Sequence, residues 1–233
     1  MLVVVALFKL INNLSWRFLS LKQLFTAHMS KSAVPVSLII LAIGFSALIY
    51  QVPFIAPFSL AVAGLVSLYI LFGNKGISYT FSKPKKLVST FFLGLIAAFV
   101  FAFSGLIFTT RVLHSTAHDN PLAVKMDWVE LLKTIPMLLG EELITIVLLL
   151  IIVNLLGGTR KALVIAVTVS TIIFGLLHLS TYDWNFAQVL LVIAFARIPF
   201  TLATLRSDSI YSGYFIHLAY DWIAFLSYML THH

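Results

Sequence analysis

Long runs of Leu, Ile, Val, Phe and Ala alternate with short polar segments along almost the whole chain. The apolar runs fall at about 34–50, 57–73, 87–110, 128–157, 162–180, 186–205 and 210–230. About 17–25 apolar residues are needed to cross a bilayer as a helix, so each run is a candidate span. Pro53 and Pro57 mark the turn between the first two runs, because proline cannot continue a helix. The pattern predicts an all-α, polytopic transmembrane helix bundle of seven spans, or eight if the N-terminal segment also crosses.

Composition excludes a soluble protein. Of the 233 residues, 61% are hydrophobic and only 10% are charged, whereas soluble domains carry about 25% charged residues. The chain has no cysteine, which excludes disulfides and a thiol nucleophile. Because the connections are short, we expect a single membrane domain over 1–233. Within it, 1–33 would be an N-terminal interfacial or partly inserted segment, 34–110 would be helices without a motif, and 125–230 would carry the chemistry.

Connections that are rich in Lys and Arg alternate along the chain with connections that are poor in them. The rich connections hold Arg17, Lys22 and Lys31, then Lys75, Lys83, Lys85 and Lys86, then Arg160 and Lys161, then Arg206. The connections between them hold few or no basic residues, and those at 111–127 accompany Asp119 and Asp127. Cytoplasmic loops of membrane proteins are enriched in Lys and Arg, so we expect the rich set to be cytoplasmic. The net charge of +7 therefore reflects membrane orientation, and no nucleic-acid partner is expected.

Ionisable residues at membrane depth occur only in the last four runs. They are Glu141, Glu142, His178, Arg197, His217 and Asp221. A charge at the centre of a spanning helix costs about 2.5–3.5 kcal/mol on insertion scales, and such residues usually serve function. The candidate chemistry therefore lies in the C-terminal half.

Glu141 and Glu142 are neighbours on a helix, so they point about 100° apart. One of them can face a cavity while the other binds a flanking helix. Two carboxylates this close in a low dielectric do not both ionise freely, which makes one a candidate general base toward water. The structural alternative is that Glu142, or both, bind the Arg197 guanidinium.

Two pairs of residues share a helix face at i, i+4 spacing. Phe174 lies with His178, and His217 lies with Asp221. Asp221 could orient the His217 ring, or the two could converge on one water or metal. A single histidine in a spanning helix more often makes a helix-to-helix hydrogen bond, and that alternative stays open for each one alone.

Several intramembrane chemistries lack their motifs. The sequence has no H-E-x-x-H and no G-x-S-x-G, which argues against a zinc-helix protease and a serine nucleophile. It also lacks the Gly-x-Gly-Asp expected of a membrane aspartyl protease. The remaining set is Glu, His, His and Asp on three helices.

Glu141-Glu142, Phe174-x-x-x-His178 and His217-x-x-x-Asp221, in this order, resemble the CAAX-protease and bacteriocin-processing (Abi) family of intramembrane proteases, which includes the type II prenyl-protein endopeptidases. The resemblance implies that Glu141 activates water and that His178 helps to hold it. It implies that His217 and Asp221 stabilise the oxyanion or orient the water, with Glu142 as a structural neighbour. The family has also been described as metalloproteases, and zinc at His178 and His217 with Glu141 or Asp221 is one reading, a metal-free site the other.

One position departs from the family pattern. The first motif usually continues E-E-x-x-x-R, and Ile146 occupies the arginine position. We expect Arg197 to replace that charge from another helix. Depth raises a second question, since the topology puts Glu141 and His178 nearer the outer face and His217 nearer the inner one. Helix tilt could bring them level.

The resemblance implies an intramembrane endopeptidase that hydrolyses a peptide bond in a membrane-associated or lipidated peptide. Members mature peptides or confer bacteriocin self-immunity, which suggests a bacterial plasma membrane. The alternatives are a non-catalytic immunity or binding protein on the same scaffold, and a proton-coupled transporter. Against the transporter, the chain shows no two-half repeat.

Overall fold

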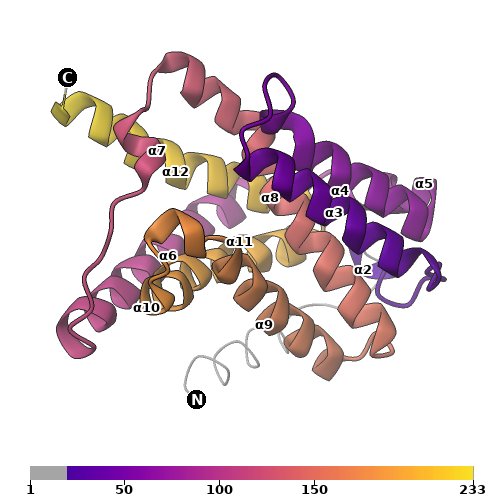
Figure 1. The fold of residues 1–233 in the computed structure, drawn as a ribbon. Helices are drawn as coiled ribbons and strands as arrows, with labels where there is room; N and C mark the ends of the chain where they lie inside the picture. The colour runs from indigo at the N-terminus through magenta and orange to yellow at the C-terminus, as the bar shows by residue number, and fades with distance from the viewer. Residues whose placement is uncertain (1–19, 233) are drawn as a thin grey trace.

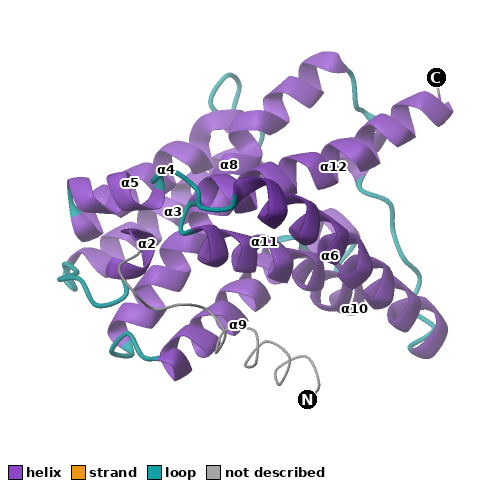
Figure 2. Cartoon of the chain, turned by 180° about the vertical axis from the view of Figure 1, so that it is seen from behind, coloured by secondary structure: helices purple, strands orange, loops and turns teal. Residues whose placement is uncertain are grey.

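The computed structural model describes residues 20–232, and within this range the chain is helical with no strand (Figure 2). The predicted all-α class is confirmed for these residues. Most of the predicted interfacial segment, residues 1–19, lies outside the described range.

The N-terminal half consists of a helical hairpin, a long third helix and short connecting helices. Their bounds are α2 (Ser20–Gln23), α3 (Ala33–Ile49), α4 (Ala56–Phe72), α5 (Asn74–Thr80), α6 (Leu87–Ile107), the π-helical η1 (Phe108–Val112) and α7 (Pro121–Val124). Helices α3 and α4 run side by side, with α5 at their far end (Figure 1).

The C-terminal half contains the four helices that carried the sequence motifs. Their bounds are α8 (Trp128–Leu155), α9 (Arg160–Leu177), the 3₁₀ turn η2 (Leu179–Tyr182), α10 (Phe186–Gln188), the π-helical η3 (Val189–Ile193), α11 (Ala194–Ser207) and α12 (Ile210–His232). Side chains cap the N-termini of two of these helices. Asp127 accepts a hydrogen bond from the Glu130 amide at the start of α8, and Thr159 accepts one from the Ala162 amide at the start of α9.

Four helical segments are long and apolar enough to cross a membrane. They are Leu87–Val112, Trp128–Leu155, Arg160–Leu177 and Phe186–Ser207. Helices α3 and α4 are apolar but have 17 residues each. Helix α12 has 23 residues but is not among the four, and it contains polar residues such as His217 and Asp221. These four segments support the prediction of an integral membrane protein. The predicted number of seven or eight spans is not confirmed.

Helix α8 lies at the centre of the largest apolar core, with α3 and α4 on one side and α9 on another. Small residues permit the closest approach between α4 and α8, as expected of membrane helices. A Cβ added at Gly140 would lie 2.6 Å from the Ala61 nitrogen and 2.8 Å from the Leu60 Cβ. The residue preceding Glu141 is therefore pressed against α4.

The basic connections converge at one end of the molecule, which we call the basic end: Lys22, Lys31, Lys75, Lys83, Lys85, Lys86, Arg160, Lys161 and Arg206. Hydrogen bonds join its segments. The Lys85 amide donates to the Ser207 carbonyl (2.8 Å), and the Lys22 amide donates to Asp208 Oδ1 (3.3 Å). Asp208 Oδ2 also lies 3.6 Å from Lys85 Nζ.

The other end, which we call the opposite end, holds the connections at 50–55, 113–127 and 178–185. The Asn185 amide group donates to the Thr116 carbonyl (2.6 Å), and His118 Nδ1 lies 3.2 Å from Asp183 Oδ2. These contacts join two connections that are far apart in sequence. The alternation of basic and poor connections in the sequence thus corresponds to two separate ends of the fold.

Candidate active site

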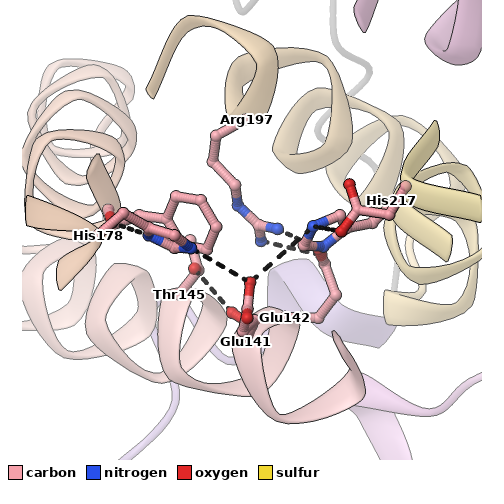
Figure 3. Close-up of polar contacts among 8 residues, drawn as sticks. Glu141, Glu142, Thr145, His178, Arg197 and His217 are labelled. Atoms are coloured by element: carbon pink, nitrogen blue, oxygen red, sulfur yellow. Dashed lines mark hydrogen bonds and ion pairs between the residues drawn. The ribbon is translucent and has the colours of Figure 1, made fainter. Parts of the chain in front are cut away.

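Glu141 lies between two imidazole rings that come from different helices (Figure 3). Its Oε2 atom is 3.8 Å from Nε2 of His178 and 3.9 Å from Nε2 of His217. These separations exceed a direct hydrogen bond, so the three polar atoms face one another without bonding directly and can contact the same small group. The structure therefore brings together the three residues that the motifs single out, and the predicted difference in depth does not separate them.

Beneath Glu141, a fully buried ion pair joins α8 to α11. Both Arg197 terminal nitrogens face the Glu142 carboxylate: Nη1 contacts Oε1, and Nη2 donates to Oε2 at 2.8 Å. Neither side chain has any exposed surface. Arg197 thus supplies across helices the charge that the Ile146 position lacks, as the sequence predicts. The bidentate geometry suits a guanidinium in particular.

Glu142 also orients His217. Its Oε1 atom lies 2.8 Å from His217 Nδ1. Because a carboxylate paired with arginine is an acceptor, Nδ1 carries the proton and Nε2 faces Glu141. Sequence reasoning proposed Asp221 for this orienting role. In the structure Asp221 Oδ2 lies on the other side of the ring, 3.7 Å from Nε2.

His178 is positioned by the end of its own helix. It is the residue at which α9 stops, and its Nδ1 lies 2.9 Å from the Phe174 carbonyl oxygen. A carbonyl oxygen only accepts, so Nδ1 donates and Nε2 points toward Glu141. The i, i+4 pair predicted from the sequence therefore acts through the Phe174 backbone, and the Phe174 ring also lies 4.7 Å from the imidazole.

Aromatic rings enclose the buried ion pair. The Arg197 guanidinium carbon lies 4.9 Å from the Phe174 ring centre and 5.7 Å from that of Phe200. Phe200 also stacks on His217, with ring centres 4.7 Å apart and planes 24° apart. These contacts stabilise a desolvated cation and hold the imidazole in place.

Two hydrogen bonds tie α12 to the first half of α8. The Tyr214 hydroxyl donates to the Ile135 carbonyl (3.0 Å), and Trp222 Nε1 donates to the Thr134 hydroxyl (2.9 Å). His217 lies between these two anchor residues along α12. The distance between His217 and Glu141 is therefore set by contacts on both sides of the site.

A cavity of about 710 Å³ leads to Glu141 and His178. Apolar side chains from α3, α4, α8 and α9 line its inner part: Phe45, Leu48, Leu60, Met137, Ile144 and Leu177. Polar side chains line the part formed by the opposite end: Gln51, Asn120, Lys125, Asp127, Ser180 and Thr181.

Exposure separates the site residues into two groups. The Glu141, His178 and Asp221 side chains are 14%, 22% and 23% exposed, whereas Glu142 and Arg197 are 0% exposed. The first group can meet a substrate, and the second can act only through its neighbours.

The spacing of the donor atoms differs from that of a tetrahedral zinc site. Ligands 2.0–2.1 Å from a tetrahedral zinc lie about 3.3–3.4 Å apart. The donor pairs here are 3.7–3.9 Å apart, and residues 20–232 contain no group of three or more His, Asp or Glu placed to hold a metal ion. In this arrangement the donors are too widely spaced. Zinc at His178, His217 and Glu141 or Asp221 stays a prediction from sequence.

Sequence reasoning missed the apolar parts of the site. Phe200 and the cavity wall from α3, including Phe45 and Leu48, carry no signal, because one more aromatic or aliphatic residue in an apolar run looks like any other. Charged residues in the same runs stood out individually.

Comparison with known proteins identifies one family. Residues 128–223 match the family model described as type II CAAX prenyl endopeptidase Rce1-like. The match covers α8 to the middle of α12, and it confirms the resemblance predicted for about residues 125–230. Neither the curated proteins nor the solved structures yield a match.

Proposed function

We propose that the chain is an intramembrane endopeptidase, because residues 128–223 match the family model described as type II CAAX prenyl endopeptidase Rce1-like. It hydrolyses a peptide bond in a membrane-associated or lipidated peptide, with Glu141 as the general base. The observation that carries this proposal is the position of the Glu141 carboxylate between the Nε2 atoms of His178 and His217, at the inner end of a cavity.

The first step is attack by water on the scissile carbonyl carbon. A water that bridges Glu141 and the two imidazoles gives one proton to the Glu141 carboxylate as its oxygen bonds to carbon. The two Nε2 atoms accept hydrogen bonds from a water or donate them once protonated, because both Nδ1 atoms already donate elsewhere. They therefore fix the position of the water before the attack.

The second step is collapse of the tetrahedral intermediate. The carbon–nitrogen bond breaks, and Glu141 returns its proton to the departing amine nitrogen. The products are a carboxylic acid and an amine, which exchange a proton to become a carboxylate and an ammonium group, and Glu141 is again ionised. Asp221, 3.7 Å from His217 Nε2, holds that imidazole when it is protonated. Glu142 and Arg197 keep its Nδ1 side fixed throughout.

The test uses the full chain in proteoliposomes with a library of lipid-anchored peptides, and mass spectrometry identifies cleaved products. Glu141→Gln keeps the shape of the side chain but removes the base, so we expect a loss of about 10²–10⁴-fold in turnover. His178→Ala and His217→Ala should each abolish cleavage. Asp183→Asn is the control, since it makes the same carboxylate-to-amide exchange at an exposed residue that does not line the cavity.

Retained turnover in the Glu141→Gln variant would remove that residue from the mechanism. A biological phenotype that persists in all three site variants would favour the non-catalytic binding protein on the same scaffold. Roles in bacteriocin self-immunity or peptide maturation depend on the peptide that the library identifies.

A further inference from the structure

The direction in which the catalytic cavity opens carries information about the substrate. Cavity-lining residues come from the last turns of α3, the connection at 50–55, the first turns of α4, the segment around α7, α8 as far as Ile144, the end of α9 and η2. Among the described residues, none of those that line the cavity belongs to the basic end. The cavity therefore reaches the site from the opposite end of the molecule.

Below the site, toward the basic end, the fold is closed. The Glu142 and Arg197 side chains have no exposed surface, and the next turns of α8 are buried in the core, with Ile146, Val147 and Leu150 at 0% exposure. The cavity therefore gives a path to Glu141 that does not pass through the basic end.

The distribution of Lys and Arg between the two ends indicates the side of the membrane on which the cavity opens. Within residues 20–232, the basic end carries the residues defined above and one acid, the buried Asp208. The opposite end, together with the adjoining turns of η1 and α8, has Arg111, Lys125 and Lys133 alongside Asp119, Asp127, Glu130 and Asp183. An excess of Lys and Arg in short connections places that end in the cytoplasm.

We propose that the cavity opens to the extracytoplasmic side and takes peptides presented there by an apolar membrane anchor. This inference rests on the proposed endopeptidase function. The inner, apolar part of the cavity suits the anchor-proximal side chains, which come from the bilayer. The polar rim at Gln51, Asn120 and Ser180 suits the hydrated part of the same peptide. A substrate tail confined to the cytoplasm would meet the closed end.

The absence of cysteine from the chain allows a direct test of sidedness. Ser180→Cys places a thiol at the exposed rim of the cavity, and Ser78→Cys places one on an exposed site of α5 at the basic end. Both exchanges are nearly isosteric. With a membrane-impermeant maleimide, Ser180→Cys should be labelled in intact cells, and Ser78→Cys should be labelled only after permeabilisation. The reverse pattern, or labelling of both in intact cells, overturns the inference.

A second measurement tests the substrate class. Peptide libraries fused to an apolar membrane anchor are expressed in two orientations, one exposing the peptide outside and the other in the cytoplasm. We expect cleavage only of the exported peptides and loss of cleavage with Glu141→Gln. Cleavage only of cytoplasmic peptides overturns the inference. No cleavage in either orientation overturns the proposed hydrolysis, whereas the labelling pattern still decides where the cavity opens.

Discussion

At the scale of single residues, the two adjacent glutamates have different surroundings. Glu141 faces the cavity and two imidazole nitrogens, whereas Glu142 is enclosed by Arg197, His217 and aromatic rings. The 100° step between successive helix positions causes this division. One carboxylate can exchange protons with a substrate water, and its neighbour stabilises the structure that aims the histidines.

The Glu142–Arg197 pair provides a prediction about stability. Arg197→Met or Glu142→Leu leaves one buried charge unpaired, so we expect each to lower the free energy of unfolding by about 3–5 kcal/mol. The double variant removes both charges and should recover most of that loss. Unfolding in detergent micelles, followed by circular dichroism, measures the three values.

Activity separates this role from simple packing. The double variant should remain inactive although it is stable, because His217 Nδ1 has lost its acceptor. Arg197→Lys should not restore wild-type stability, since an ammonium cannot make the bidentate contact. A loss in the double variant equal to the sum of the two single losses would show that the two charges do not interact.

The residues predicted from sequence were those whose chemistry conflicts with an apolar run. Glu141, His178 and His217 belong to recognisable spacings, and the missing arginine at Ile146 led to Arg197 as its replacement. The partner of His217 Nδ1 was not predicted, because i, i+4 spacing pointed to Asp221 while the contact from Glu142 depends on how two helices pack. Sequence periodicity describes one helix and contains no information about the rotation of its neighbour.

At the scale of elements, the position of α8 decides where Glu141 points. Pro136 lies inside this helix, and it leaves the Leu132 carbonyl without its usual amide partner. Gly140 follows one turn later and contacts α4 closely, while Tyr214 and Trp222 bind the same part of α8 from α12. Glu141, the proposed general base, thus lies where α4, α8 and α12 meet at short distance.

The α4–α8 contact should be sensitive to side-chain volume at Gly140. A Cβ there would overlap Leu60 and Ala61, so Gly140→Ala and Gly140→Val should destabilise the protein progressively, by about 1–3 kcal/mol for valine. Turnover should fall in the same order, because displacement of α8 changes the Glu141–histidine distances. Thermal unfolding and the peptide assay measure both effects.

Leu132→Val is the control for that series, as Leu132 is an exposed residue of the same helix. Leu132→Val should change neither the thermal stability nor the peptide turnover measurably. Wild-type stability in Gly140→Val would mean that α4 and α8 can separate without cost, and it would remove this contact from the account of the site.

At the scale of the whole molecule, the sequence predicted helix positions well and the number of membrane crossings less well. The apolar run at 87–110 corresponds to α6 and η1, and the run at 186–205 to α10 through α11. Apolar composition locates helices because every backbone group in a bilayer must be paired internally. It does not determine whether the short α3 and α4 or the polar α12 cross completely, since tilt and packing decide this.

Polar side chains hold the basic end of the molecule together, and Asn154 is the clearest case. Its amide nitrogen, on the last turn of α8, lies 3.2, 3.4 and 2.8 Å from the carbonyl oxygens of Leu24, Phe25 and Ala27. In the structure it binds the backbone of the segment before α3, whose Leu21, Leu24 and Phe25 side chains are buried in the main core.

Asn154→Leu should loosen this segment without changing the catalytic site. The exchange nearly conserves volume but leaves carbonyl groups unpaired, at a cost of about 1–3 kcal/mol, which corresponds to a 5- to roughly 150-fold change in a local opening equilibrium. Hydrogen exchange at residues 21–29 should accelerate accordingly, whereas hydrogen exchange around Glu141 and peptide turnover should be unchanged.

Asn74→Leu is the control, because it makes the same substitution at an exposed position of α5 where no such contact is lost. Unchanged exchange at 21–29 in Asn154→Leu would mean that apolar burial alone holds the segment, and slower turnover would mean that the basic end is coupled to the site through α8.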